Sequence, residues 1–177
     1  SQDPAVRAVL LQGSGRAFVA GGDLAALRAD PVQCAQDLLG PLNETLLLLQ
    51  GLNAPVIAQV HGACIAGGLM LAWICDFIVA SDDAIFGLPE VDRGALGAAT
   101  HLARLVPQHL MRTLYFTAQN VTAQQLEHFG SVYKVVPRDA LLGTALDDVQ
   151  AMAAEGSHLL DRDSPYTGRF IRWVEQY

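Results

Sequence analysis

The sequence predicts an α/β domain with a mainly parallel sheet, and three observations lead to that prediction. Short apolar runs such as VIAQV (56–60) and DFIVA (76–80) have the length and branched side chains of buried strands. Longer helical segments separate these runs, which is the alternation typical of parallel sheets. A chain of 177 residues with 51% hydrophobic residues is long enough for one domain with a sizeable core.

Turn residues and helix caps divide the chain into the remaining elements. In chain order we expect a strand over 5–12, helices over 23–28 and about 31–50, the strand over 56–60, an apolar helix over 68–75, strands over 76–80 and 85–86, a loop over 88–97, helices over 97–106 and 108–117, a strand over 131–136 and a helix from 139. Pro41 is expected to break or kink its helix, since proline lacks an amide N–H. Asp23 can cap the first helix, and Thr122 with Gln125 can form a capping box.

Charge and cysteine content exclude several classes of protein. The formal net charge of −7 argues against a general nucleic-acid or anionic-membrane surface, because both need clustered Lys and Arg. No apolar run reaches the ~18 residues of a membrane span. The cysteines Cys34, Cys64 and Cys75 are odd in number and lack CxxC spacing. They predict neither a disulfide scaffold nor a zinc site, and they indicate a reducing, cytoplasmic location.

Two glycine turns each lead into a helix. In HGACIAGGLM (61–70), Gly67 and Gly68 stand at the start of the apolar helix, where free backbone N–H groups attract anionic oxygen. The turn AFVAGGD offers further amides around Ala20. Two such N–H groups directed at one carbonyl oxygen form an oxyanion hole. The alternative is that each glycine pair only permits tight packing of a helix against a strand.

A single carboxylate, Glu90, follows Pro89 in the segment FGLPEVDRG (86–94). A carboxyl group partly removed from water has a raised pKa and can exchange protons near neutral pH. The alternative is an ordinary solvated loop residue. Asp92, two positions further on, is expected to be a loop carboxylate or a helix cap.

Four motifs in a fixed order resemble the crotonase superfamily, the enoyl-CoA hydratase/isomerase proteins. They are RAFVAGGD, PVIAQVHGACIAGG, CDFIVASDDAIFGLPE and TAQNVTAQQLEHFGSVYKVVP, and the resemblance runs from about Val6 to Leu142. It implies a crotonase-like ββα spiral core over 1–142, with N-terminal strands preceding Ser1. It also implies a C-terminal helical segment over 143–177 that takes part in trimerisation, and hence a homotrimer or hexamer.

The resemblance further implies an acyl-CoA thioester as ligand, with coenzyme A as part of the substrate and no separate cofactor or metal. The thioester oxygen would be held by the amides of Ala20 and Gly67, with Glu90 as the acid/base. The other residues expected to contact substrate are Gly21, Gly22, Asp23, Leu24, Gly68 and Met70.

Met70 is the main departure from the family pattern, because hydratases of the family carry a second glutamate at this position. Because Glu90 is the only matched acid/base, the sequence favours double-bond isomerisation by proton transfer over hydration. Hydration and carbon–carbon cleavage remain open, since Met70 can instead shape an apolar acyl pocket. The alternative to an enzyme is a catalytically silent acyl-CoA-binding or scaffold protein of the same fold.

Other polar side chains near these motifs have structural explanations. His61 and His101 are expected to be structural, Cys64 to be a small core residue, and Asp76 to form an internal hydrogen bond.

Overall fold

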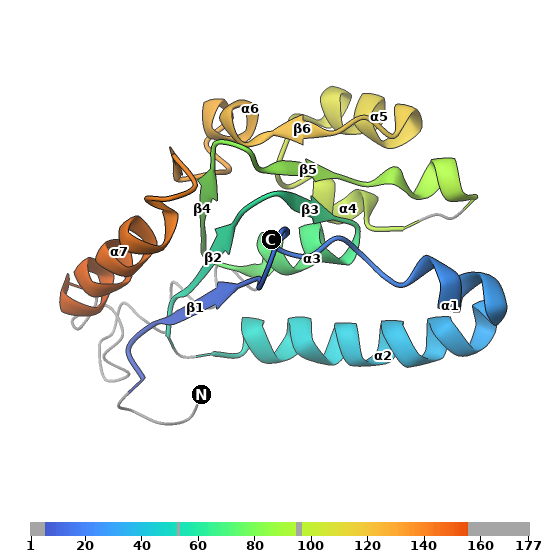
Figure 1. Ribbon diagram of the computed structural model, residues 1–177, viewed down its shortest axis with the longest axis horizontal. Helices are drawn as coiled ribbons and strands as arrows, with labels where there is room; N and C mark the ends of the chain where they lie inside the picture. The colour runs from blue at the N-terminus through green and yellow to red at the C-terminus, as the bar shows by residue number, and fades with distance from the viewer. Residues whose placement is uncertain (1–5, 53, 95–96, 156–177) are drawn as a thin grey trace.

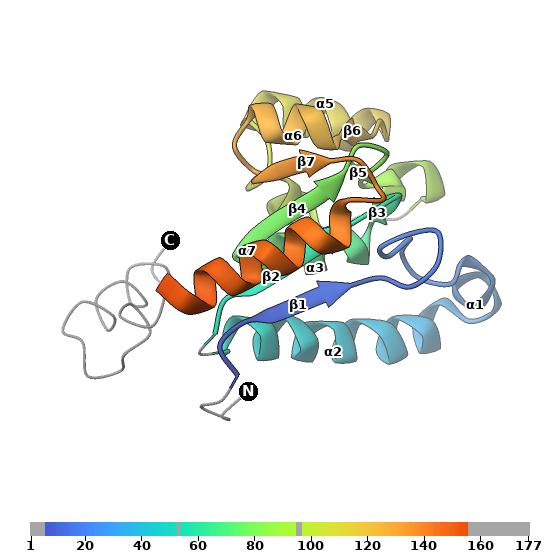
Figure 2. The ribbon, with the colours of Figure 1, turned by 60° about the vertical axis from the view of Figure 1, so that its left-hand side comes forward.

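Four parallel strands form the main sheet of the computed structural model, which describes residues 6–52, 54–94 and 97–155. In spatial order they are β1 (Val9–Gln12), β2 (Val56–Val60), β4 (Phe77–Ser81) and β7 (Lys134–Val136). Figure 1 shows the whole chain, and Figure 2 shows β7 beside β4. A smaller sheet contains β3 (Ala63–Ile65), β5 (Ile85–Gly87) and β6 (Val121–Thr122), with β6 antiparallel to β5. The α/β prediction is therefore confirmed.

Twice along the chain, a strand of the main sheet is followed by a strand of the smaller sheet and then by a helical segment. The chain passes from β2 through β3 into α3 (Gly67–Ile74), and from β4 through β5 into the 3-10 helix η1 (Pro89–Arg93). This repeat is the expected ββα unit. The other helices are α1 (Leu24–Ala29), α2 (Pro31–Gln50), α4 (Ala99–Leu102), α5 (Gln108–Thr117), α6 (Ala123–His128) and α7 (Leu141–Glu155).

Both faces of the main sheet are covered, as the burial of all five residues of β2 requires. Val56, Ala58 and Val60 pack in the larger core with Leu69 of α3. Ile57, which points to the opposite face, packs with Leu141 of α7. Figure 2 shows α7 lying across one face of this sheet. The helix α3, which begins at the second glycine turn, is therefore fixed against the sheet.

Several expected details are confirmed by side-chain hydrogen bonds. Asp23 accepts from the amides of Ala25 and Ala26 at 2.7 and 3.3 Å and so caps α1. Thr122 and Gln125 form a reciprocal capping box. Asp76 accepts a 2.8 Å hydrogen bond from the Val56 amide.

Pro41 was expected to break or kink its helix, and the first of these alternatives is wrong. The helix α2 is continuous from Pro31 to Gln50 with Pro41 inside it. Pro41 is exposed, so the helix carbonyl that loses its N–H partner can be hydrated. The carbonyl oxygen of Pro41 itself accepts a 2.8 Å hydrogen bond from the Thr45 hydroxyl.

Two expectations on either side of the gap at 95–96 also need correction. The expected loop over 88–97 contains η1, which begins at Pro89, a residue suited to a first helical position. The helix expected over 97–106 is only the single turn of α4, followed by turns stabilised by short-range bonds such as Leu105 N–H to Leu102 O at 3.0 Å. Residues 156–177 lie outside the described part of the chain.

Within the described ranges, no helix combines the length and the hydropathy that crossing a membrane requires.

Candidate active site

The two glycine turns lie next to each other because the chain around Val19 pairs with β3. Val19 N–H donates to Ala63 O at 3.1 Å, and Ile65 N–H donates to Val19 O at 2.9 Å. Val19 thus forms a parallel bridge with Cys64. Ala20 and Ala66 each follow directly after this pairing. The structure therefore brings together two motifs that are more than 40 positions apart, as the sequence shows.

The N–H groups of Ala20 and Gly67 are the two donors that the sequence analysis assigns to the oxyanion hole. In the part of the chain that the structure describes, neither N–H donates to another backbone group. Gly67 is the first residue of α3, and the first N–H groups of a helix have no partner within it. Unused donors at adjacent turns are one requirement of an oxyanion hole, and the other is that both N–H groups point at one oxygen atom.

Gly68, rather than Gly67, is the glycine that packing requires. A Cβ added at Gly68 lies 2.3 Å from Val19 O and 2.8 Å from Val19 Cβ, far inside contact distance. A Cβ added at Gly67 meets only Leu42 Cδ2 at 3.6 Å, an ordinary contact. Gly68 therefore allows α3 to approach the first turn closely. The packing explanation of the glycine pair holds for Gly68, and the role of Gly67 in binding stays a prediction.

Ala66, between β3 and α3, has a strained backbone that the sequence analysis missed. Its φ of 54° and ψ of −116° lie in a region that residues with a Cβ rarely adopt. Its N–H donates to Gly87 O at 3.0 Å, which ties the turn to β5. Strain of this kind persists where surrounding contacts fix the backbone, and here it sets the direction of the next peptide group, that of Gly67.

We expect Ala66→Gly to increase the free energy of unfolding by about 1 kcal/mol, because glycine adopts a positive φ without strain. Urea denaturation measures this change. The matched control is Ala103→Gly, at a residue with φ −61°, which is expected to lose stability by a similar amount. A loss of stability in Ala66→Gly equal to that of the control contradicts the assignment of strain.

Met70 lies on α3, one helical turn or less from Gly67. Leu69 and Ala72 of this helix are buried toward the core, whereas Met70 is half-buried. Met70 is therefore not part of the fully buried face of α3, and its role in binding the acyl group stays a prediction.

Glu90 is held in η1 with one carboxyl oxygen enclosed. The side chain is half-buried, and its Oε2 has no hydrogen-bond partner among the described residues. Burial raises the pKa of the Glu90 carboxyl above its ordinary value. An enclosed oxygen without a partner and a raised pKa are both properties of a general acid/base. Asp92, on the same 3-10 helix, is exposed instead.

The remaining expected site residues lie in or beside the first turn. Gly21 has a φ of +98°, Gly22 is exposed, and Leu24 begins α1. The described hydrogen bonds of the Asp23 carboxylate both go to α1, so this residue fixes the start of that helix.

The side chains expected to be structural include His61 and Cys64. His61 is buried, with Nε2 3.2 Å from Gly15 O. Cys64 is fully buried, and burial raises the pKa of its thiol well above the ordinary range. A thiol that stays protonated is a poor nucleophile. Among the described residues, no three His, Cys, Asp or Glu side chains are placed to hold a metal ion.

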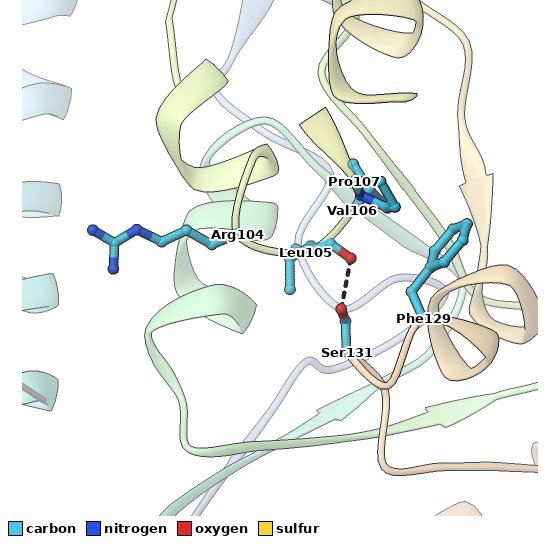
Figure 3. A pocket seen from close by; sticks show the side chains of 6 residues that line it. All are labelled: Arg104, Leu105, Val106, Pro107, Phe129 and Ser131. Carbon is cyan, nitrogen blue, oxygen red and sulfur yellow. Dashed lines mark hydrogen bonds between the residues drawn. The ribbon is translucent and has the colours of Figure 1, made fainter. Parts of the chain in front are cut away.

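Two surface hollows lie away from the glycine turns. One, of about 220 Å³, lies between the α4–α5 connection and the end of α6, where Ser131 donates to Leu105 O (Figure 3). The other, of about 380 Å³, is lined by Glu44, Leu47 and Leu48 of α2. Neither hollow has Ala20, Gly67 or Glu90 in its lining.

The parallel main sheet, the smaller sheet and the repeated ββα units define a crotonase fold. The chain belongs to the enoyl-CoA hydratase/isomerase family, whose model matches residues 1–162. The resemblance stated from the four motifs is therefore confirmed.

Three similar proteins illustrate this membership. The chain is 52% identical to a (7aS)-7a-methyl-1,5-dioxo-2,3,5,6,7,7a-hexahydro-1H-indene-carboxyl-CoA hydrolase of Rhodococcus jostii, over 90% of the chain and 62% of that relative. It is 36% identical to a crotonyl-CoA hydratase of Syntrophomonas wolfei, over 80% of the chain and 56% of that relative. The crystal structure of an enoyl-CoA hydratase/isomerase from Xanthobacter autotrophicus superposes with a TM-score of 0.85 and 31% identity, over 99% of the chain and 65% of that protein. The chain thus spans about three-fifths of the length of these curated relatives.

Proposed function

We propose that this chain forms the catalytic core of an enzyme that stabilises the enolate of an acyl-CoA thioester. The amides of Ala20 and Gly67 hold the thioester oxygen, and Glu90 is the single acid/base. The observation that carries this proposal is the enclosed, unpartnered Oε2 of Glu90, in a fold that also places two unused amides at adjacent turns. An oxyanion hole supplies several kcal/mol to such a reaction.

The substrate contacts and the assembly belong to the same proposal. Gly21, Gly22, Asp23 and Leu24 border the coenzyme A part of the substrate, with Gly68 and Met70 beside the acyl part. Coenzyme A enters with the substrate, so the reaction needs no separate cofactor. The protein assembles as a homotrimer or a hexamer, as the family resemblance implies.

For the reaction itself we propose hydrolysis of a carbon–carbon bond in an alicyclic acyl-CoA thioester. The name of the Rhodococcus jostii relative describes a hydrolase acting on a two-ring, dioxo CoA thioester, and the identity of 52% supports a similar substrate class. With Met70 in place of a second carboxylate, Glu90 is the only matched acid/base, and the hydrolytic step proposed below uses one such group to move protons.

The proposed step uses one base and one oxyanion hole. Glu90 takes a proton from water, and the water oxygen bonds to a ring ketone carbon. The bond between this ketone carbon and the neighbouring ring carbon then breaks, at the ring carbon whose negative charge the thioester can delocalise. Its electron pair forms the enolate, whose oxygen accepts hydrogen bonds from the amides of Ala20 and Gly67. Glu90 returns the proton to carbon, which leaves a new carboxylic acid and an intact thioester.

The second candidate is double-bond isomerisation, which a single proton carrier such as Glu90 can also perform.

Mass spectrometry in ¹⁸O-labelled water distinguishes the reactions, with a two-ring β-keto acyl-CoA and matched 2-enoyl- and 3-enoyl-CoA as substrates. One ¹⁸O in a new carboxylate, with CoA still attached, supports the proposed hydrolysis. Migration of the double bond without ¹⁸O supports isomerisation, and ¹⁸O in a 3-hydroxyacyl product supports hydration. No change in any substrate overturns the enzyme proposal in favour of a silent binding protein.

We expect Met70→Glu to raise the rate of hydration of a 2-enoyl-CoA at least tenfold, because the added carboxylate can orient water beside the double bond. Coupled assays of 3-hydroxyacyl-CoA formation measure this rate. The control variant Met70→Gln has a similar size but cannot accept a proton, and it is expected to leave the rate low. Equal rates in the two variants contradict the proposed position of Met70 in the acyl site.

A further inference from the structure

One face of α2 carries a stripe of four leucines, Leu38, Leu42, Leu46 and Leu49. Their spacing of four, four and three residues places the side chains along one side of a helix. The inner part of the stripe packs in the protein, because Leu46 is buried and Leu49 packs against the larger core. The outer part is more accessible, since Leu42 is half-buried and Leu38 is 42% exposed. The stripe therefore continues past the core and leaves apolar surface uncovered.

The two outer leucines stand beside the two glycine turns, one leucine at each turn. A Cβ added at Gly67 lies 3.6 Å from Leu42 Cδ2, so this methyl group is at the first residue of α3. A Cβ added at Gly22, two residues beyond Ala20, lies 3.0 Å from Leu38 Cδ2. Figure 1 and Figure 2 both show α2 running beside α3, with which it is in contact. Each turn therefore has a leucine methyl group close to its backbone.

Apolar side chains at this place affect the strength of hydrogen bonds made there. Ala20 is exposed and Gly67 is half-buried, so the described residues do not enclose the two turns. Hydrogen bonds are stronger where water is excluded, and the stabilisation that an oxyanion hole provides depends on that exclusion. A ligand held between the turns and the leucines displaces water from both.

We infer that Leu38 and Leu42 form an apolar cover over the bound thioester group and exclude water from the oxyanion hole. This inference rests on the proposed function, and it assigns two substrate-contacting residues that the sequence analysis did not identify. The occupant is the acyl-CoA thioester, because the uncovered methyl groups lie at Gly22 and Gly67, which the proposed function places beside the substrate. Contact with the thioester removes apolar surface of both leucines from water and so stabilises the complex.

The test measures the stretching frequency of the thioester carbonyl, which falls as the hydrogen bonds to its oxygen become stronger. A saturated two-ring acyl-CoA with ¹³C at the thioester carbonyl is studied by isotope-edited infrared spectroscopy, free in water and bound to the protein. We expect a lower frequency on the wild type, and a partial return toward the value in water on Leu42→Ala. Calorimetry is expected to show about tenfold weaker binding to this variant. Leu38→Ala is expected to change both quantities less, because Leu38 lies two residues beyond the Ala20 donor.

The control variants lie on the same helix. Leu47 and Leu48 are 68% and 71% exposed and line a hollow whose lining includes neither glycine turn. Leu47→Ala and Leu48→Ala are therefore expected to leave the frequency and the affinity unchanged. Leu42→Met keeps an apolar side chain of similar volume and is expected to retain most of the frequency shift. A leucine with a role only in stability would lower the melting temperature of Leu42→Ala without moving the carbonyl frequency.

The possible outcomes separate the inference from the proposed function. A frequency shift on the wild type that is unchanged in Leu42→Ala and Leu38→Ala overturns the inference and leaves the proposed function intact. A thioester that binds the wild type without a shift, or that fails to bind, overturns the proposed oxyanion hole and the inference with it. If the leucines instead pack against a second copy of the chain, the alanine variants change the assembly seen by sedimentation velocity and leave the frequency unchanged, which also overturns the inference.

Discussion

Replacing Glu90 with glutamine lowers the turnover of the thioester about 10²- to 10⁴-fold and, near pH 7, raises the melting temperature of the protein. The first effect follows because general acid/base catalysis supplies a factor of this size, and glutamine cannot carry a proton. The second follows because the charged Glu90 carboxylate is partly desolvated and its Oε2 has no partner. Removing such a charge relieves a cost to the folded state.

The pH dependence of the stability difference has a defined sign. The pKa of Glu90 is higher in the folded protein than its ordinary value of 4.5, so the folded state binds the proton more tightly than the unfolded state. Stability from this group is therefore present at low pH and is lost as the pH rises through the folded pKa. We expect the melting temperatures of wild type and Glu90→Gln to differ most at neutral pH, with the gap closing as the pH falls toward 4.5.

Calorimetry between pH 4 and pH 8, together with steady-state kinetics, measures both effects. The matched control is Asp92→Asn, an exposed carboxylate on the same 3-10 helix, which is expected to change neither. The acid limb of kcat/KM in the wild type should lie above pH 4.5, since only the ionised Glu90 accepts a proton. Turnover that survives in Glu90→Gln removes Glu90 from the mechanism.

Gly68→Ala is expected to be the most damaging of the single-methyl additions at the glycine turns. The new Cβ lies 2.3 Å from Val19 O, which is a backbone atom and accepts the Ile65 amide that joins the two turns. Relief of the clash must separate the turns. We expect a loss of about 3 kcal/mol in stability, at the upper end for overpacking. A displacement of the amides by about 1 Å lowers turnover about 10²-fold.

Gly67→Ala is the matched control, because its Cβ meets only Leu42 at 3.6 Å. Alanine also favours a helix over glycine by about 1 kcal/mol, and the backbone N–H is retained. We expect this variant to fold as well as the wild type. Chemical denaturation and kinetics of both variants measure the contrast. Equal damage in the two variants would falsify the assignment of Gly68 to packing.

The parts of the fold that could be predicted were those specified by local sequence patterns. VIAQV is apolar throughout because both faces of β2 are covered, and it was predicted with its correct bounds. The capping box at Thr122 also depends on neighbouring residues alone. The continuation of α2 through Pro41 could not be predicted, because the local sequence shows only the lost N–H and the ring clash of proline.

The sequence proposes residues for the candidate site, but the geometry that joins its two turns could not be predicted. The pairing of Val19 with Cys64, which joins the two turns, is a long-range contact without a local signal. Alanine at position 66 gives no indication of a positive φ, since glycine is the residue expected there. The edge-to-face contact of the His101 ring with Trp73 is likewise a contact between two helices that no local pattern reveals.

The central claim is that the amides of Ala20 and Gly67 stabilise a thioester enolate while Glu90 moves its proton. The most direct test is proton–deuterium exchange at the α-carbon of a saturated acyl-CoA in heavy water, followed by NMR, because exchange requires the enolate and no later step. We predict exchange with the wild-type protein and its loss in Glu90→Gln, with thioester binding retained. Absence of exchange in a wild-type protein that binds the thioester, or equal exchange in the variant, contradicts the account.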